Sequence, residues 1–189
     1  MNRKFAKMLI SSKSVGTIAA LLGKPSDVFC SGLFLSARWF VVSQLSYEGI
    51  QVIVLPDRES AEYCAVDLYN LIEGDCVFFM PDSGKTLEKS NYKASLGVQR
   101  TSAIGKIMEY GGGSLVIVTY PAALEEAVPV PDEIRKAVMR LSVGDEISHD
   151  SLAETLVENG FERVDFVAEP GQFARRGAVA AIFSYSYND

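Results

Sequence analysis

The first 128 residues alternate between short, uninterrupted apolar segments and longer segments in which apolar residues recur with helical spacing. Strands that are buried on both faces of a parallel sheet have continuous apolar sequences, whereas the helices between them keep a polar side. This alternation predicts an α/β domain with a parallel sheet and helices on both of its faces. The expected strands are 28–31, 51–55, 76–80 and 115–119, and the expected helices are 2–22, 36–47, 60–71, 94–110 and 121–126. The apolar stripe expected on helix 60–71 comprises Ala61, Cys64, Leu68 and Leu71.

The pattern changes after residue 128, where Pro129-Val130-Pro131 predicts an extended linker. A helix is expected over 149–159, with Leu152, Leu156 and Val157 on its apolar face. Two strand-like segments follow, 161–168 and 173–183, with a turn between them. Strands that follow each other through a turn indicate a small α+β unit. We therefore expect two domains, 1–128 and 129–189, the second truncated because it has few strands for its size.

The two C-terminal segments are expected to form an antiparallel β-hairpin around Pro170-Gly171, because glycine supplies the positive φ that a type II turn needs. In the register closed by this turn, Asp165 lies opposite Arg176. Arg163 is then a diagonal neighbour of Arg176 on the same face of the hairpin.

The other face of the hairpin is expected to hold Val164, Phe166 and Phe173, which can pack on the helix 149–159. Arg175 also falls on that face and must reach its edge. A one-residue slip in register would exchange the two faces.

The arginines of this hairpin allow two interpretations. One is a cross-strand ion pair on a solvated face, worth about 0.2–1 kcal/mol. The other is a protein-recognition patch, because arginine and aromatic residues dominate the hot spots of protein interfaces. On the second interpretation, the candidate partner-binding residues are Arg163, Arg176, Arg175 and Phe173.

Two segments resemble parts of a phosphate-binding loop, whose pattern is G-x-x-x-x-G-K-[ST]. Ser83-Gly84-Lys85-Thr86 matches the end of the pattern, but Phe79 stands where its first glycine belongs, so a polar turn is the better interpretation. The second segment starts at Gly32, between an expected strand and an expected helix. It lacks the second glycine, the lysine and the hydroxyl, because Ala37, Arg38 and Trp39 occupy those positions.

The second segment therefore matches a phosphate loop in position and length but not in chemistry. It is either an ordinary strand-loop-helix connection or a degenerate nucleotide site that does not bind phosphate. The residues of this degenerate loop are Gly32, Ser36, Ala37 and Arg38. We expect no ATP binding and no cofactor.

Composition and net charge argue against several classes of function. The net charge of −6 disfavours a stand-alone nucleic-acid-binding module, which needs basic excess. A single histidine, His149, argues against a Ser-His-Asp triad, and the three cysteines have no metal-ligand spacing and suggest reduced thiols. No apolar stretch reaches the roughly 18 residues of a membrane span. These features fit a cytoplasmic protein.

The segment GFERVDFVAEPGQFARRGAVAAIF, residues 160–183, resembles the UvrB-homology region of bacterial transcription-repair coupling factors (Mfd). It is also similar to the excision-nuclease subunit UvrB, and SGLFLSARWFVVSQL is similar to the degenerate phosphate loop of the coupling factors. The sequence departs from the family pattern at Ala181, where an acidic residue is usual, and at Leu35, where the degenerate loop keeps a glycine.

The resemblance implies an N-terminal, non-catalytic segment of an ATP-driven DNA translocase. The family protein displaces stalled RNA polymerase on double-stranded DNA through domains that this chain lacks, and it recruits nucleotide excision repair. Its small second domain binds UvrA through arginines that correspond to Arg163 and Arg176, and we expect Arg175 and Phe173 to assist by proximity. The alternatives are a nucleotide-binding P-loop enzyme, a UvrB-like DNA damage-binding subunit and an unrelated two-domain scaffold.

Overall fold

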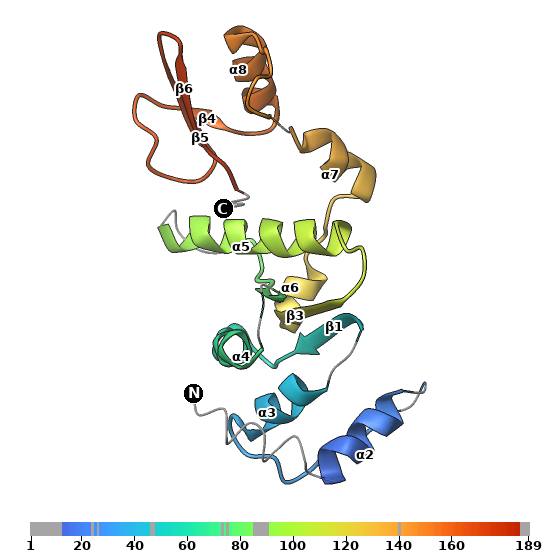
Figure 1. Ribbon diagram of the computed structural model, residues 1–189. Coiled ribbons are helices and arrows are strands. Elements are labelled where there is room, and N and C mark those ends of the chain that lie inside the picture. The colour runs from blue at the N-terminus through green and yellow to red at the C-terminus, as the bar shows by residue number, and fades with distance from the viewer. Residues whose placement is uncertain are drawn as a thin grey trace. The chain divides into compact units, whose positions relative to one another are not determined.

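The computed structural model describes residues 13–23, 25, 27–45, 48–72, 74, 76–84, 91–139 and 141–185 (Figure 1). The chain forms two compact units. Unit 1 comprises Met1–Met80 and Glu109–Pro121, and unit 2 comprises Pro81–Met108 and Ala122–Asp189. The domain boundary expected after residue 128 stays a prediction, and the start of the expected helix 2–22 lies outside the described residues.

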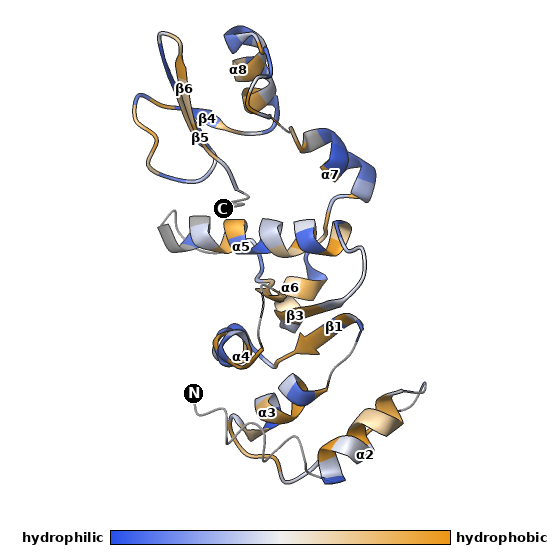
Figure 2. Ribbon diagram, in the orientation of Figure 1, coloured by the Kyte–Doolittle hydropathy of each residue, from blue (hydrophilic) through white to orange (hydrophobic). Residues whose placement is uncertain are grey.

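Unit 1 contains a parallel three-stranded sheet. Its strands are β1 (Gly49–Val54), β2 (Val77–Phe79) and β3 (Ser114–Thr119), in the order β1-β3-β2. Three of the four expected strands are therefore confirmed. Figure 2 shows β1 and β3 mainly in the colours of hydrophobic residues. The central strand β3 is buried from its second residue onward, as its continuous apolar sequence requires. The Thr119 hydroxyl donates to the carbonyl oxygen of Met80 at 2.8 Å and so satisfies a buried polar group.

Three described helices accompany this sheet: α2 (Lys13–Leu22), α3 (Ala37–Gln44) and α4 (Arg58–Leu71). Helix α4 packs on β2, β3 and α3 through Ala61, Cys64 and Leu68, which are fully buried, so this part of the expected stripe is confirmed. At the start of α4, the Asp57 side chain accepts the backbone N–H of Ser60 at 2.8 Å. Hydrogen bonds from Ser60 hold the pKa of the Asp57 carboxyl below its usual value.

Two expectations for unit 1 were wrong. Residues 27–31 form no strand, and Phe29 in this segment is 94% exposed. A short apolar run becomes a strand only where a neighbouring strand can pair with it, and in the described part of unit 1 the sheet consists of β1, β3 and β2 without this segment. The helix expected over 36–47 is shorter and buries only Trp39, so it is not sandwiched between layers.

Strand β1 also differs from its expected burial. Its residues alternate between half-buried and exposed, with Ile50, Val52 and Val54 exposed, so one face of β1 is left largely uncovered. The α/β character of unit 1 is therefore confirmed, whereas the burial of all its strands on both faces is not.

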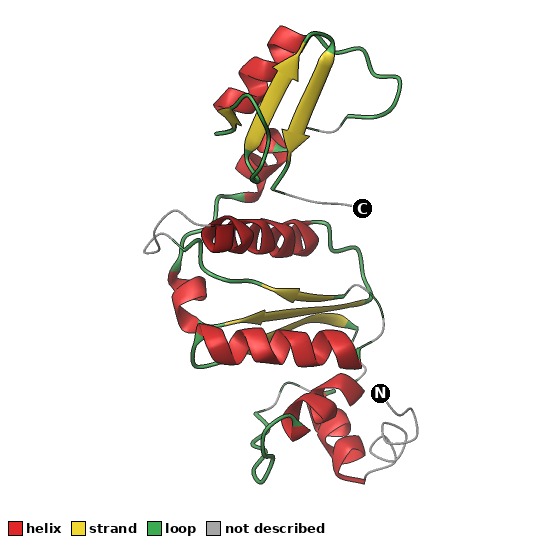
Figure 3. Cartoon of the chain, turned by 90° about the vertical axis from the view of Figure 1, so that its left-hand side faces the viewer, coloured by secondary structure: helices red, strands yellow, loops and turns green. Residues whose placement is uncertain are grey.

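Unit 2 contains the helices α5 (Asn91–Met108), α7 (Pro131–Ala137) and α8 (His149–Glu158), and α6 (Pro121–Glu125) begins at its boundary. Its sheet consists of β4 (Glu162–Arg163), β5 (Gln172–Arg176) and β6 (Val179–Phe183), in that order. Strand β4 runs parallel to β5, and β5 pairs antiparallel with β6 (Figure 3). Among the described residues, no helix is long and apolar enough to cross a bilayer.

The expected hairpin around Pro170-Gly171 was wrong. The hairpin is formed by β5 and β6, with its turn at Gly177-Ala178, where Arg176 pairs with Val179. Gly177 has a φ of +59° at the first turn position, as a type II′ turn requires. Type II′ turns match the twist of paired strands, whereas the type II turn expected at Pro170-Gly171 opposes it.

Helix α8 and the β4–β5–β6 sheet are called the C-terminal module below. The core of this module lies between the helix and the sheet. Leu152, Leu156 and Phe173 form a buried cluster, and Met139, Ala153, Phe161 and Ala180 pack against it. Two of the three residues expected on the apolar face of α8 are thus confirmed, but Val157 is 57% exposed. In an α-helix, residue 157 lies about 100° away from residue 156, which turns it off the buried stripe.

Candidate protein-binding site

The four candidate partner-binding residues all lie on strands β4 and β5. Arg163 ends β4, and Phe173, Arg175 and Arg176 belong to β5. Arg163, Arg175 and Arg176 are exposed, whereas Phe173 is only 2% exposed. The β4–β5 ribbon therefore presents three guanidinium groups and buries the aromatic ring that was expected to accompany them.

Arg176 stacks on Phe166, which was expected on the opposite face of the hairpin. The central carbon of its guanidinium lies 4.3 Å from the centre of the Phe166 ring, which is a cation–π contact. One guanidinium N–H points to the Asp165 carbonyl oxygen at 3.5 Å. Phe166 was expected to pack on α8, yet its side chain is 75% exposed. The expected cross-strand arrangement of Asp165 and Arg176 is absent, because residue 165 precedes β5 in a connecting loop rather than in a paired strand.

The loop that carries Phe166 runs from residue 164 to residue 171 and is fixed at both ends. At its start, the Val164 N–H donates to the Phe173 carbonyl oxygen at 2.9 Å. At its end, the side-chain oxygen of Gln172 accepts the N–H groups of Ala168 and Glu169 at 2.9 and 3.0 Å. The backbone of this loop, called the 164–171 loop below, is therefore held by β5 itself.

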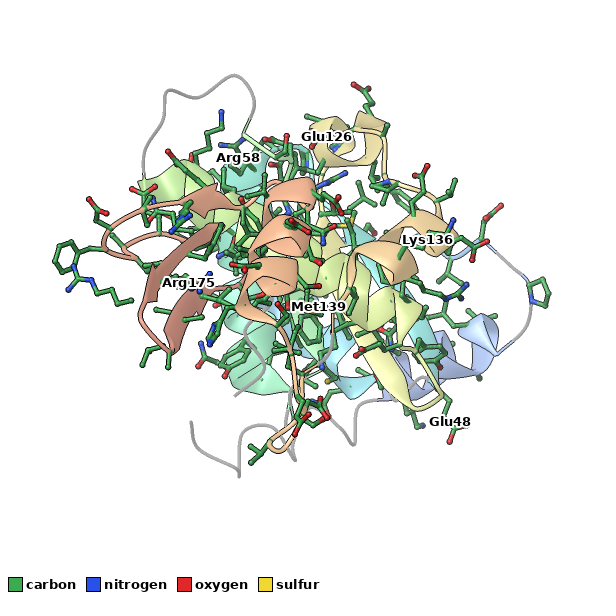
Figure 4. All side chains as sticks on the ribbon, turned by 90° about the horizontal axis from the view of Figure 1, so that it is seen from above. Glu48, Arg58, Glu126, Lys136, Met139 and Arg175 are labelled. Atoms are coloured by element: carbon green, nitrogen blue, oxygen red, sulfur yellow. The ribbon has the colours of Figure 1, made fainter. Side chains whose placement is uncertain are left out.

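Phe173 and Arg175 lie on the side of β5 that faces α8. The Phe173 ring belongs to the buried cluster with Leu152 and Leu156, so it supports the ribbon from inside and does not form part of the surface. Figure 4 labels Arg175 among the side chains of the chain. Its guanidinium donates to the carboxylate of Asp150 at 2.6 Å, in the first turn of α8. Arg175 does reach the edge of its face, as expected, and there it ties β5 to α8.

Arg163 and Arg176 do not share a face. Arg163 pairs with Phe173 in the parallel register, so it lies on the same side of the sheet as Phe173 and Arg175. Arg176 lies on the other side, together with Gln172. No described residue forms a hydrogen bond or an ion pair with the Arg163 guanidinium, and the residue is exposed. Because β4 is an edge strand, a partner can approach Arg163 past that edge.

Gly171 is the last residue of the 164–171 loop, and two features of the structure favour glycine at this position. Its φ is +85°, and an added Cβ would collide with the hydroxyl and ring of Tyr185, which also packs edge-on against Phe161. We expect Gly171→Ala to lower the free energy of unfolding by about 1–2 kcal/mol for the backbone strain alone, with a further loss from the collision.

Urea unfolding followed by circular dichroism measures this loss. Gly177→Ala is the matched control, because Gly177 has a φ of +59° but no atom within 4 Å of an added Cβ. A Gly171→Ala variant no less stable than Gly177→Ala would contradict the proposed collision.

The expected degenerate phosphate loop lacks the strand that leads into such a loop, because the described residues 27–31 just before Gly32 form none. The Ser36 hydroxyl donates to the Asp67 carboxylate at 2.8 Å, and the Arg38 guanidinium donates to the Leu35 carbonyl oxygen at 3.3 Å. Arg38 also lies 4.6 Å from the centre of the Trp39 ring. The polar side chains of this segment are thus engaged with the chain itself, and Ala37 is simply the first residue of α3.

Near this segment, burial raises the pKa of the Cys64 thiol to about 12. This thiol is therefore protonated and unreactive at neutral pH. Cys30, in contrast, is exposed.

The segment Ser83-Gly84 after β2 has its donors occupied by carboxylates. The Ser83 N–H donates to the Glu126 carboxylate at 2.6 Å, the Ser83 hydroxyl donates to the same carboxylate, and the Gly84 N–H donates to Asp82 at 2.7 Å. These are the kinds of groups that would surround a phosphate, and here protein anions take its place. Lys85 and Thr86 lie outside the described residues. In the described part of the chain, no three His, Cys, Asp or Glu side chains gather to hold a metal ion.

Comparisons with known proteins agree with the position of the ribbon in the sequence. The model of the UvrB interaction domain matches residues 139–189, which contain α8 and the whole β4–β5–β6 sheet. Arg163, Phe166 and Arg176 therefore all lie inside the matched segment.

The chain is also similar to curated proteins over most of its length. It is 31% identical to the transcription-repair-coupling factor of Bacillus subtilis over 156 residues, which cover 81% of this chain and 13% of that protein. It is 31% identical to the transcription-repair-coupling factor of Mycobacterium tuberculosis over 158 residues, covering 79% of this chain and 12% of that protein. It is 32% identical to the UvrABC system protein B of Streptococcus suis over 112 residues, covering 59% of this chain and 16% of that protein.

The matched part is thus about an eighth of the length of the coupling factors. The similarity to the coupling factors extends over more of this chain than the similarity to UvrABC system protein B. The chain therefore belongs to the transcription-repair-coupling factor family, of which it carries the UvrB-homology region.

Proposed function

We propose that this chain is a non-catalytic recruitment segment that binds UvrA and thereby brings nucleotide excision repair to stalled transcription. The match to the UvrB interaction domain and the names of the relatives support a role in excision repair. In the longer family protein, RNA polymerase and double-stranded DNA would be contacted by other domains. On this proposal the segment needs no ATP and no metal ion.

The observation that carries the proposal is the exposure of Arg163 and Arg176 on one ordered ribbon. Arg163 has no hydrogen-bond or ion-pair partner among the described residues, and Arg176 has one weak hydrogen bond, to a carbonyl oxygen at 3.5 Å. Each guanidinium carries five donors, so most of them are available for acceptors of another molecule. An arginine whose donors are free and whose backbone is held in a strand suits bidentate recognition of a carboxylate.

Two of the alternatives, a nucleotide-binding enzyme and a DNA-binding module, have less support. A nucleotide-binding enzyme needs backbone donors free to meet phosphate, and those of Ser83 and Gly84 are bound to carboxylates. A stand-alone DNA-binding module needs a basic surface, and this chain has a net charge of −6.

We expect Arg163→Ala and Arg176→Ala each to weaken binding to UvrA by at least about 1 kcal/mol, or about fivefold in Kd. Both side chains are exposed, so neither substitution removes buried packing, and the unfolding transition should stay in place. Isothermal titration calorimetry of the 189-residue chain with its cognate UvrA measures the affinity.

Arg135→Ala is the matched control. Arg135 is an exposed arginine on α7 that pairs with Asp132 at 2.8 Å, so its loss removes one positive charge without touching the β4–β5 ribbon. The proposal predicts wild-type affinity for this variant. Wild-type affinity in the Arg163→Ala/Arg176→Ala double variant would remove the assignment of the ribbon as the UvrA site.

A further inference from the structure

We infer that Phe166 is a docking residue beside Arg176 and that the two side chains act together as one recognition unit. This inference rests on the proposed function, because the partner is taken to be the protein that binds the arginines. It adds a residue that the arginine-based assignment does not contain, and it specifies the chemistry of the partner surface.

The first support is the exposure of the Phe166 ring. Its side chain is 75% exposed, although the module has an apolar core that Phe173 fills from the other side of the ribbon. A phenylalanine left in water forgoes the favourable free energy of burying its ring. An exposed aromatic residue in a position that stability does not require is a typical interface anchor.

The second support is the stacking geometry. The guanidinium of Arg176 lies over the Phe166 ring at 4.3 Å, so the ring covers one face of the cation. The N–H groups of a guanidinium point outward in its own plane, and stacking therefore leaves them free for hydrogen bonds. The stack also restricts the rotamers of both side chains before a partner arrives, which reduces the entropy lost on binding.

The third support is the way the backbone holds the ring in place. Gln172 accepts the N–H groups of Ala168 and Glu169, and the Val164 N–H is bound to Phe173, so the 164–171 loop is anchored on both sides of Phe166. The loop therefore presents the ring in a defined position instead of leaving it on a free chain. Preformed loops with an aromatic tip contribute to affinity because little order must be gained on binding.

These features define the partner surface. It should contain an apolar hollow that receives the exposed part of the Phe166 ring and a carboxylate at the rim of the hollow that accepts the N–H groups of Arg176. Acidic neighbours of the ribbon, Asp165 and Glu169, would repel a partner that is acidic throughout, so the carboxylates must be placed locally. The occupant is a folded protein with a mixed apolar and acidic groove.

A double-mutant cycle between Phe166 and Arg176 tests this inference, with UvrA as the probe and titration calorimetry as the measurement. We expect Phe166→Ala to weaken binding at least about fivefold. If the two residues act as one unit, Phe166→Ala should have much less effect in the Arg176→Ala background than in the wild type. Phe166→Trp should retain binding because it keeps a ring under the cation, whereas Phe166→Leu should behave like Phe166→Ala.

The outcomes separate the inference from the proposed function. Wild-type affinity for Phe166→Ala, together with weakened binding by Arg163→Ala and Arg176→Ala, would overturn the inference and leave the proposed function intact. Wild-type affinity in all three variants would overturn both. Additive losses in the double variant, or wild-type affinity of Phe166→Leu, would show that the ring and the guanidinium do not act as one unit.

Discussion

Replacing Arg100 by alanine is expected to lower the free energy of unfolding by about 3–5 kcal/mol, a large effect for a single side chain. Arg100 lies on α5 and is only 7% exposed. Its guanidinium donates to the carbonyl oxygens of Pro81 at 2.8 Å, Ala123 at 3.1 Å and Glu126 at 3.1 Å. It also lies 3.6 Å from the Glu126 carboxylate. One side chain thus joins three segments of unit 2 that are distant in sequence.

The size of this effect comes from what the substitution leaves behind. Without the guanidinium, three carbonyl oxygens lose a donor, and the largely buried Glu126 carboxylate loses its cationic neighbour. Unsatisfied buried polar groups cost free energy individually, and an uncompensated carboxylate costs more.

Urea unfolding followed by far-ultraviolet circular dichroism measures the change. Arg135→Ala is again the control, because its ion pair is 68% and 82% exposed and should contribute at most about 1 kcal/mol. The double variant Arg100→Met/Glu126→Gln should recover part of the loss, since it removes the buried charge along with its partner. Equal stability of Arg100→Ala and Arg135→Ala would mean that the network of Arg100 does not hold unit 2 together.

Replacing Phe173 by alanine is expected to lower the free energy of unfolding by about 3–5 kcal/mol. The Phe173 ring is 2% exposed and packs on Leu152 and Leu156 of α8. This cluster is the core between α8 and the β4–β5–β6 sheet, so a cavity here weakens the packing of the helix on the sheet. Small modules have few such clusters and lose a large part of their stability with each of them.

Hydrogen exchange locates this loss within unit 2. The amide of Gly171, which donates to the Phe183 carbonyl oxygen at 2.8 Å, should exchange faster in Phe173→Ala because β5 and β6 open together. Phe166→Ala is the matched control: it removes the same ring from an exposed site and should change stability by less than about 0.5–1 kcal/mol. Protection of the Gly171 amide at the wild-type level in Phe173→Ala would show that the cluster does not support the ribbon.

These two phenylalanines show where sequence reasoning reached its limit. Both were assigned to one face of a predicted hairpin, because the strand register closed by a turn at Pro170-Gly171 would place them on the same face. The pairing of β4 with β5 is instead parallel, so Phe166 falls in the connecting loop and has no strand position at all. No local signal separates the two arrangements, because a two-residue strand such as β4 has too few residues to show a period.

The sequence by itself determined the elements in which the apolar residues are continuous or recur with a clear period. The positions of the three parallel strands of unit 1, the buried stripe of α4 and the helix α8 follow from it, since a run or stripe of apolar residues favours an element that can bury it. Strand β1 was located in the same way, although Ile50, Val52 and Val54 stay exposed. It also located the segment that bears Arg163 and Arg176.

Only the tertiary structure decided which segments pair. It left residues 27–31 outside the sheet, placed the hairpin turn at Gly177, put Arg163 and Arg176 on opposite sides of the ribbon, and set Phe166 beneath the Arg176 guanidinium. Pairing depends on contacts between residues far apart in the chain, and a strand offers the same backbone donors and acceptors to any neighbour.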